Sequence, residues 1–260
     1  MSGEFKLIVT TSRLAKSTTR ALARRKSADW GFLYVERSDR SIELTLSDAS
    51  EDAGAAFVFR DDGLVLSTAQ TQLRFDLGTA AIRLLSLARG ERDWLVSVGE
   101  LIAGDRVFDA TLGLGRDAIV AARAVGPHGE VLGVESNLAL FTLVSEGLAS
   151  YDVGAESATI QTALGDSWKL LSRTSNASFD VVIIDAMFST PTQSDGNFEA
   201  LRGFADHTSL HPEWIRQARR VAKRWALTKA PHGEPWFGSE GLQRVPGMEA
   251  SRWWRARGCS

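Results

Sequence analysis

Short apolar runs alternate with stretches of helical spacing along most of this chain. Residues 131–134 and 179–184 form compact apolar runs, as strands buried on both faces of a parallel sheet do. Apolar residues at helical spacing follow the strand-like runs at 117–125 and 138–148. Further strands are predicted at 106–109, 158–162 and 225–228, a helix at 212–223, and two short strands in the tail at 242–245 and 252–257. The pattern predicts an α/β fold with a doubly wound, mostly parallel sheet.

The first 75 residues form a separate pattern. It predicts strands at 5–10 and 31–35, helices at 14–26 and 41–49, and a hairpin over 55–66 whose turn holds Asp-Asp-Gly63. We therefore expect a small N-terminal α/β lobe over residues 1–75 and a larger domain over residues 76–260. Basic residues concentrate on the helix at 14–26. We interpret them as a solvated face, with an RNA-phosphate patch as the alternative.

Composition narrows the class of protein. Hydrophobic residues make up 44% and charged residues 24% of the 260 residues, and the apolar runs are too short to span a bilayer. The N-terminus does not resemble a secretory signal, so a cytoplasmic protein is expected. Cys259 is the single cysteine, which excludes an internal disulfide. His207 and His211 are four residues apart, but no acid lies between them and Pro212 follows, so we expect a helix entry and no metal site.

A glycine-rich segment follows the strand at 106–109. Gly113, Gly115 and Ala118 match the G-x-G-x-x-G/A spacing, in which small residues allow a tight turn and a close approach of the backbone to a ligand. Glu135 ends the next predicted strand, where a carboxylate can accept both hydroxyl protons of a ribose. The segment therefore predicts a nucleotide-binding loop. The alternative is a structural turn that binds no ligand.

Polar residues follow four of the predicted strands. In a doubly wound sheet, ligands bind outside the carboxyl ends of the strands, so these residues should share one edge. One acid in such a place is often only a helix cap, whereas four in register predict a binding crevice. The four groups are Asp109 with Thr111, Glu135 with Ser136, Asp166 with Ser167, and Asp185.

The segment Asp109-Ala-Thr-Leu-Gly-Leu-Gly-Arg-Asp-Ala118, together with these acids, resembles the class I S-adenosylmethionine-dependent methyltransferases. Within them it is similar to the small-subunit ribosomal RNA guanine-N2 methyltransferases and their uncharacterised bacterial relatives. Asp185-Ala-Met-Phe188 is similar to that family's Asp-Pro-Met-Phe segment, with Ala186 in place of proline. The resemblance covers residues 100–257. It implies a Rossmann-like methyltransferase sheet with an antiparallel C-terminal strand.

The resemblance also implies roles for individual residues. Asp109 and the glycine loop would hold the methionine end of S-adenosylmethionine, Glu135 the ribose, and Asp166 the adenine amine. The whole cofactor-binding set would be Asp109, Thr111, Gly113, Gly115, Glu135, Ser136, Asp166 and Ser167. Asp185 would accept an N–H from an exocyclic guanine amine and stabilise the charge that develops during methyl transfer. Phe188 would stack on the extruded base of a structured RNA.

Other interpretations of these residues remain open. A dinucleotide-dependent oxidoreductase would use Gly113, Gly115 and Glu135 but gives Asp166 and Asp185 no role. A module that binds S-adenosylmethionine without catalysis is favoured by Ala186, and a small-molecule methyltransferase by the acidic isoelectric point. Lys229 at the end of a strand is interpreted as solvated, with a phosphate or the acceptor as the alternative partner. Of Trp253 and Trp254, at most one can face the site, because neighbouring residues of a strand point to opposite faces.

Overall fold

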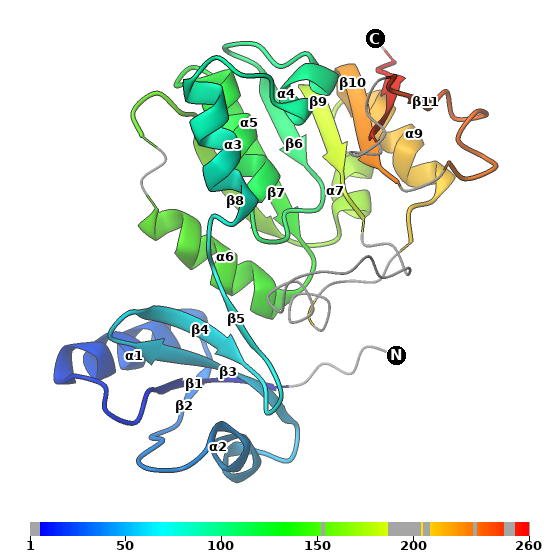
Figure 1. The fold of residues 1–260 in the computed structure, drawn as a ribbon. Coiled ribbons are helices and arrows are strands. Elements are labelled where there is room, and N and C mark those ends of the chain that lie inside the picture. The colour runs from blue at the N-terminus through cyan, green and yellow to red at the C-terminus, as the bar shows by residue number, and fades with distance from the viewer. Residues whose placement is uncertain are drawn as a thin grey trace. The chain divides into compact units, whose positions relative to one another are not determined.

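The computed structural model describes residues 6–151, 154–186, 204, 209–230, 233–246 and 253–259. These residues divide into two compact units, shown in Figure 1. The N-terminal unit holds residues 6–76 and Phe204, and the C-terminal unit holds the other described residues from Leu77 onward.

The N-terminal unit is built on a five-stranded sheet of order β2-β1-β3-β4-β5. The first three strands in this order are parallel, and β4 and β5 complete the sheet in antiparallel fashion. The elements are β1 (Lys6–Thr11), α1 (Ser17–Trp30), β2 (Leu33–Tyr34), α2 (Ile42–Ala49), β3 (Ala53–Arg60), β4 (Gly63–Ser67) and β5 (Gln72–Arg74). The predicted hairpin is confirmed as β3 and β4, while β5 was not predicted.

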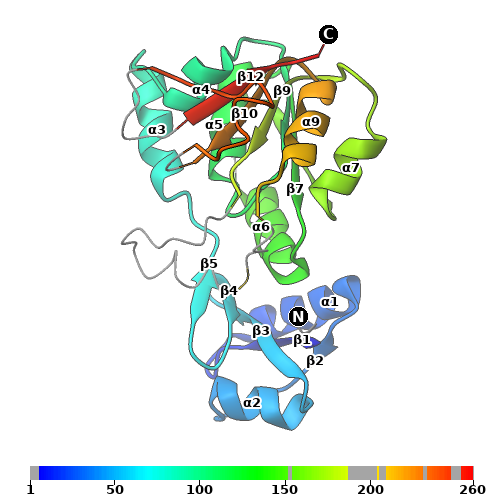
Figure 2. The ribbon, with the colours of Figure 1, turned by 90° about the vertical axis from the view of Figure 1, so that its right-hand side faces the viewer.

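Both faces of this sheet are covered because β3 is apolar on both sides. Ala56 and Val58 pack with Ile42 and other apolar residues on the side of α2. The alternate residues Phe57 and Phe59 contact the ring of Trp30 at the end of α1. The period of two along the strand therefore places one helix on each face, as Figure 2 shows.

The C-terminal unit is built on a seven-stranded sheet of order β11-β12-β10-β9-β6-β7-β8. The five strands from β10 to β8 are parallel, and β12 pairs antiparallel with both β10 and β11. The strands are β6 (Arg106–Asp109), β7 (Glu130–Glu135), β8 (Thr159–Leu164), β9 (Phe179–Ile184), β10 (Ala222–Lys229), β11 (Gln243–Arg244) and β12 (Trp253–Arg257). The predicted Rossmann-like sheet and its antiparallel C-terminal strand are confirmed.

Helices cover both faces of this sheet. The helices are α3 (Thr79–Ala88), α4 (Trp94–Gly99), α5 (Arg116–Val125), α6 (Leu138–Ser150), α7 (Ser167–Arg173) and α9 (Pro212–Val221). In Figure 2, α7 and α9 lie on the opposite side of the sheet from α3, α4 and α5. This arrangement follows from the right-handed crossovers that connect parallel strands.

The helix predicted over residues 212–223 is wrong at its C-terminal end. The helix ends at Val221, and Ala222 and Lys223 already belong to β10. Ala222 is fully buried and pairs with Phe179 of β9, so sheet pairing overrides the helical spacing of these residues. The predicted helix entry at His211 is confirmed, because its Nδ1 accepts a hydrogen bond from the Trp214 amide at 3.3 Å.

Because β6, β7, β8, β9 and β10 are parallel, their carboxyl ends meet at one edge of the sheet. Asp109, Glu135 and Lys229 are the last residues of three of these strands, and Asp185 follows a fourth directly. We call this the carboxyl edge. It is the edge at which doubly wound sheets bind their ligands.

Candidate functional site at the carboxyl edge

The glycine loop between β6 and α5 is held tightly against β7. Gly113 and Gly115 have φ angles of 53° and 74°, a left-handed conformation that favours glycine. The loop packs on the sheet through Leu112, since a Cβ atom on Gly133 would lie 2.4 Å from its Cδ1. The loop therefore has the tight turn that its spacing predicted, and α5 begins directly after it.

Glu135 fastens this loop to the end of β7. Its carboxylate accepts hydrogen bonds from the backbone amides of Gly113 at 3.1 Å and Asn137 at 2.9 Å. The side chain is buried. A carboxylate has about four lone-pair positions, and backbone amides of the loop and of the residue before α6 occupy two of those of Glu135. The structure thus places Glu135 beside the glycine loop.

Asp109 lies at the centre of the carboxyl edge and is only 2% exposed. Its Oδ1 accepts a hydrogen bond from the Thr111 amide at 3.1 Å. Burial, with a smaller contribution from the nearby Asp117, raises the pKa of Asp109 to about 7. Such a carboxyl is ionised most readily when a cation lies next to it.

Thr111 connects the glycine loop to the end of β9. Its hydroxyl oxygen accepts a hydrogen bond from the Asp185 amide at 2.6 Å. Since this contact joins residues 74 positions apart, it fixes the start of the segment after β9 relative to the loop. Thr111 therefore bridges the two halves of the edge.

Asp166 follows β8, the outermost strand of the carboxyl edge, and caps α7. Its Oδ1 accepts a hydrogen bond from the Lys169 amide at 3.2 Å, at the start of α7, and its side chain is exposed. Ser167 is buried, while Ser136, which follows β7, is exposed. Of the predicted acceptor segment, Asp185 and Ala186 are described, and Phe188 lies outside the described residues.

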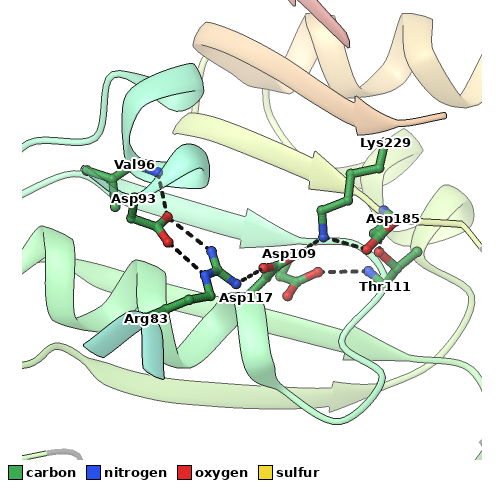
Figure 3. A network of polar contacts seen from close by, with 8 residues as sticks. All are labelled: Arg83, Asp93, Val96, Asp109, Thr111, Asp117, Asp185 and Lys229. Carbon is green, nitrogen blue, oxygen red and sulfur yellow. Dashed lines mark hydrogen bonds and ion pairs between the residues drawn. The ribbon is translucent and has the colours of Figure 1, made fainter. Parts of the chain in front are cut away.

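Lys229 is ion-paired and only partly exposed, which corrects the interpretation of a simply solvated lysine made from the sequence. Its Nζ atom lies 2.6 Å from Oδ2 of Asp185 and 2.6 Å from Oδ2 of Asp117. The ammonium also lies 4.7 Å from the centre of the Trp253 ring. Strand β10 ends beside β9, so this lysine points along the edge towards two acids, as Figure 3 shows.

The ion pairs continue from Lys229 into α3 and α4. Arg83 donates to Asp117 at 2.6 Å and, through Nε, to Asp93 at 2.7 Å, and Asp93 caps α4 by accepting from the Val96 amide. Figure 3 shows these side chains as one connected row. We call Asp93, Arg83, Asp117, Lys229 and Asp185 the charged row.

Within the charged row, burial and ion pairing shift the pKa values of the side chains in opposite directions. Burial raises the pKa of Asp117, but Lys229 and Arg83 outweigh it and hold that pKa below its usual value. Burial also raises the pKa of Asp185, and Lys229 opposes this rise without cancelling it. Burial lowers the pKa of Lys229, but Asp117 and Asp185 outweigh it and raise that pKa, so the lysine is a permanent cation.

A cavity of about 160 Å³ opens beside the charged row. It is lined by Arg83, Asp93, Trp94, Leu95, Asp117, Lys229 and Trp253. Trp253 faces this cavity, while Trp254 contacts the ring of Phe237 and donates from Nε1 to the Ala230 carbonyl. The two rings therefore point to opposite faces of β12, as the alternation of side chains along a strand predicts.

Sequence reasoning missed Arg83, Asp93 and Asp117 as members of the site. Asp117 could have been suspected, because it lies in the first turn of the helix that the glycine loop opens. Arg83 and Asp93 carry no comparable signal, since they lie before the loop in segments of helical spacing. Only the packing of α3 and α4 near α5 brings them to the edge.

Comparison with known proteins identifies the family. The sequence model of the SAM_MT family, described as "Putative SAM-dependent methyltransferase", matches residues 43–246. The chain is also 32% identical over 236 residues to the uncharacterized protein YpiP of Bacillus subtilis, covering 88% of this chain and 91% of that protein. The chain belongs to the SAM_MT family. It is therefore an S-adenosylmethionine-dependent methyltransferase by family, and the sulfonium nucleoside is its cosubstrate.

The relatives whose names include a substrate match a smaller part of this chain. The Ribosomal RNA small subunit methyltransferase J of Thioalkalivibrio sulfidiphilus is 29% identical over 224 residues, covering 79% of this chain and 86% of that protein. The crystal structure of the SAM-dependent methyltransferase NGO1261 from Neisseria gonorrhoeae superposes with a TM-score of 0.55 at 19% identity, covering 95% of this chain and 93% of that one. The structural likeness shows the fold.

The residues at the carboxyl edge fit the cosubstrate of the SAM_MT family. S-adenosylmethionine carries a sulfonium and an ammonium, and Asp109 is a buried acid that a neighbouring cation would ionise. The glycine loop, with Gly113 and Gly115, lies at the same edge of the sheet as Asp109. The Gly113 amide of this loop donates a hydrogen bond to Glu135. Within the described residues, no group of three histidine, cysteine or acidic side chains could hold a metal ion, and no helix is long and apolar enough to cross a membrane.

Proposed function

We propose that this chain transfers a methyl group from S-adenosylmethionine to the exocyclic amine of a guanine in structured RNA, such as ribosomal RNA. The observation that carries the proposal is the position of Asp185. It lies at the carboxyl edge between the glycine loop, to which Thr111 ties it, and Lys229. Lys229 contacts its Oδ2 at 2.6 Å, and no described residue forms a hydrogen bond to its Oδ1.

The proposed chemistry gives each of these groups one task. S-adenosylmethionine supplies a methyl group on a sulfonium, and the carbon–sulfur bond breaks as the amine nitrogen forms a bond to carbon. Asp185 accepts an N–H of the amine, which localises the lone pair and stabilises the positive charge on nitrogen until a proton leaves. Lys229 holds the carboxylate from its other side. Asp109, the glycine loop and Glu135 orient the cosubstrate for an in-line displacement.

The choice of RNA rests on two observations. Asp185-Ala-Met-Phe188 is similar to the acceptor segment of ribosomal RNA guanine-N2 methyltransferases. Two relatives are also named Ribosomal RNA small subunit methyltransferase J, from Hahella chejuensis and Thioalkalivibrio sulfidiphilus. The match to the Hahella protein covers 50% of this chain and 49% of that protein, so the second relative carries more weight.

The test is methylation of ribosomal RNA taken from cells that lack this protein. Wild type should incorporate labelled methyl groups, and nucleoside analysis should find N2-methylguanosine. Asp185→Asn should lower the rate by roughly a hundredfold or more, as loss of a group that assists proton movement does. Its affinity for S-adenosylhomocysteine should stay within about twofold, because the proposed role of Asp185 lies in turnover and not in cosubstrate binding.

The matched control is Asp180→Asn, at the amino end of the same strand. Asp180 is also paired with a lysine, Lys223, at 3.2 Å. This control should keep nearly full activity. Full activity of Asp185→Asn would contradict the role proposed for this acid. Binding of S-adenosylhomocysteine without transfer to any RNA would favour a binding module or a small-molecule substrate.

A further inference from the structure

The N-terminal unit collects three arginines at one edge of its sheet. Strands β1, β2 and β3 are parallel, so their carboxyl ends meet there. Arg13 follows β1, Arg37 follows β2, and Arg60 is the last residue of β3. The register supports this placement, because Val9 of β1 pairs with Tyr34 of β2 and Thr11 of β1 pairs with Phe59 of β3.

Two of these side chains share a single hydrogen-bond acceptor. The Nε atoms of Arg37 and Arg13 both donate to the carbonyl oxygen of Arg40, at 2.9 Å and 3.4 Å. Their guanidinium groups are therefore neighbours despite their like charge. Within the described part of the chain, none of Arg13, Arg37 and Arg60 forms an ion pair with a carboxylate. We call these residues the arginine triad.

Several other arginines of this unit form ion pairs. Arg20 and Arg24 of α1 both pair with Glu36, at 2.6 Å and 2.9 Å. Arg40 pairs with Asp48 at 2.7 Å, and Asp62, two residues after Arg60, pairs with Arg74 at 3.1 Å. The RNA-phosphate patch considered for the helix at 14–26 is thus partly cancelled on α1. The triad at the strand ends forms no such ion pair within the described residues.

The triad carries an electrostatic cost in the free protein. Burial lowers the pKa of Arg37, and the charges of Arg13 and Arg60 lower it further. A partly buried cation among like charges is unfavourable unless an anion joins it. A phosphodiester group matches this need, since its oxygens accept the paired N–H groups of guanidinium in a bidentate fashion.

We propose that Arg13, Arg37 and Arg60 form a binding site for a phosphodiester group of the RNA substrate. The proposal rests on the proposed function for the identity of its ligand. The site would anchor RNA to the N-terminal unit without reading its sequence, because phosphate contacts position a nucleic acid and carry no base information.

The experiment measures binding of full-length protein to a labelled small-subunit ribosomal RNA transcript, without S-adenosylmethionine, over a series of salt concentrations. Arg37→Gln should weaken binding by about tenfold and reduce the slope of log affinity against log salt by about 0.7 to 0.9, as loss of one phosphate contact does. Arg13→Gln should act in the same direction. The control is Arg25→Gln, which removes an exposed charge of α1 and should change affinity by less than about twofold.

Melting temperature gives a second readout. If the triad exists for a ligand, Arg37→Gln should melt at or above the temperature of wild type, because it relieves repulsion in the free protein. If Arg37→Gln unfolds instead, the RNA affinity of Arg13→Gln tests the site. Arg13 is exposed, so its replacement should not unfold the protein. Equal losses in the triad variants and in Arg25→Gln, or no loss in the triad variants, would overturn the site. RNA binding without methyl transfer would refute the proposed function and leave this inference standing.

Discussion

Strands β9 and β10 are joined by a lysine–aspartate pair at each end, and the two pairs differ in the charged groups that surround them. At the amino end, Lys223 lies 3.2 Å from Asp180, and the lysine is 47% exposed. At the carboxyl end, Lys229 lies 2.6 Å from Asp185 and is 28% exposed. The second pair continues into Asp117 and the rest of the charged row, and Lys229 lines a cavity.

The two pairs consist of the same residue types, so the difference between them comes from their positions at opposite edges of the sheet. An exposed ion pair contributes about 0 to 1 kcal/mol and depends on salt. At the carboxyl edge, Lys229 also pairs with Asp117, which is 12% exposed, so removing the lysine leaves two carboxylates without a cation. The carboxyl-edge pair therefore keeps its charges at an energetic cost, and proteins accept such costs at functional sites.

The largest expected effect compares the two lysines. Lys229→Met should lower the free energy of unfolding by about 3 kcal/mol, because it leaves Asp117 and Asp185 without their shared cation. Lys223→Met should cost at most about 1 kcal/mol. Urea unfolding measures both values. Equal costs for the two variants would remove the distinction between the two edges.

The same variant sharpens the positioning role of Lys229 in the proposed reaction. Lys229 lowers the pKa of Asp185, so Lys229→Met should raise that pKa and move the acidic limb of the pH–rate profile to higher pH. A merely structural lysine would lower the rate without moving the profile. Lys229→Arg, which keeps the charge, should retain the wild-type profile.

A second comparison uses the two acids at the ends of β7. Glu135 lies at the carboxyl edge, and Glu130 lies at the amino edge, where it pairs with Arg106 at 2.7 Å. Glu135→Ala should weaken binding of S-adenosylhomocysteine by roughly tenfold to a hundredfold, since hydrogen bonds to a charged group contribute about 1.5 to 3 kcal/mol. Glu130→Ala should leave the affinity unchanged. Isothermal calorimetry distinguishes them, and similar losses would refute the ribose role of Glu135.

How much the sequence could predict depends on the distance along the chain between the residues of each contact. The glycine loop was predictable, because Gly113 and Glu135 lie 22 residues apart in one strand–loop–helix–strand unit. Lys229 was misjudged, because its partners Asp185 and Asp117 lie 44 and 112 residues away. The spacing of residues predicts local turns and the buried faces of helices and strands. It does not predict which distant strand ends lie together, because that depends on the order of strands in the sheet.

A fourth prediction concerns the pH dependence of protein stability. With the pKa of Asp109 raised to about 7, the folded protein binds a proton between about pH 4 and pH 7 that the unfolded chain has released. The stabilising contribution of Asp109 is therefore present at low pH and is lost as pH rises through about 7. The free energy of unfolding of wild type, relative to Asp109→Asn, should fall over this range.

A cation bound beside Asp109 should reverse this preference. The ammonium of S-adenosylhomocysteine would favour the ionised carboxyl, so affinity should rise as pH increases from about 6 to about 8, with release of protons on binding below pH 7. Calorimetry in buffers of different ionisation enthalpy counts those protons. Asp109→Asn should bind with an affinity that does not change over this range. The same pH dependence in wild type and variant would assign the titration to another group.

The smallest expected effect separates two roles of Asp166, whose side chain caps α7 and was predicted to contact adenine. Asp166→Ser keeps an N-cap hydroxyl but has a shorter reach, so it should preserve stability and weaken S-adenosylhomocysteine binding a few fold. Asp166→Ala should also lose about 1 kcal/mol of stability through the missing cap. If the serine variant binds as wild type does, Asp166 is a cap only. The row of functional acids would then end at Glu135, because the outermost strand, β8, would contribute no side chain to the site.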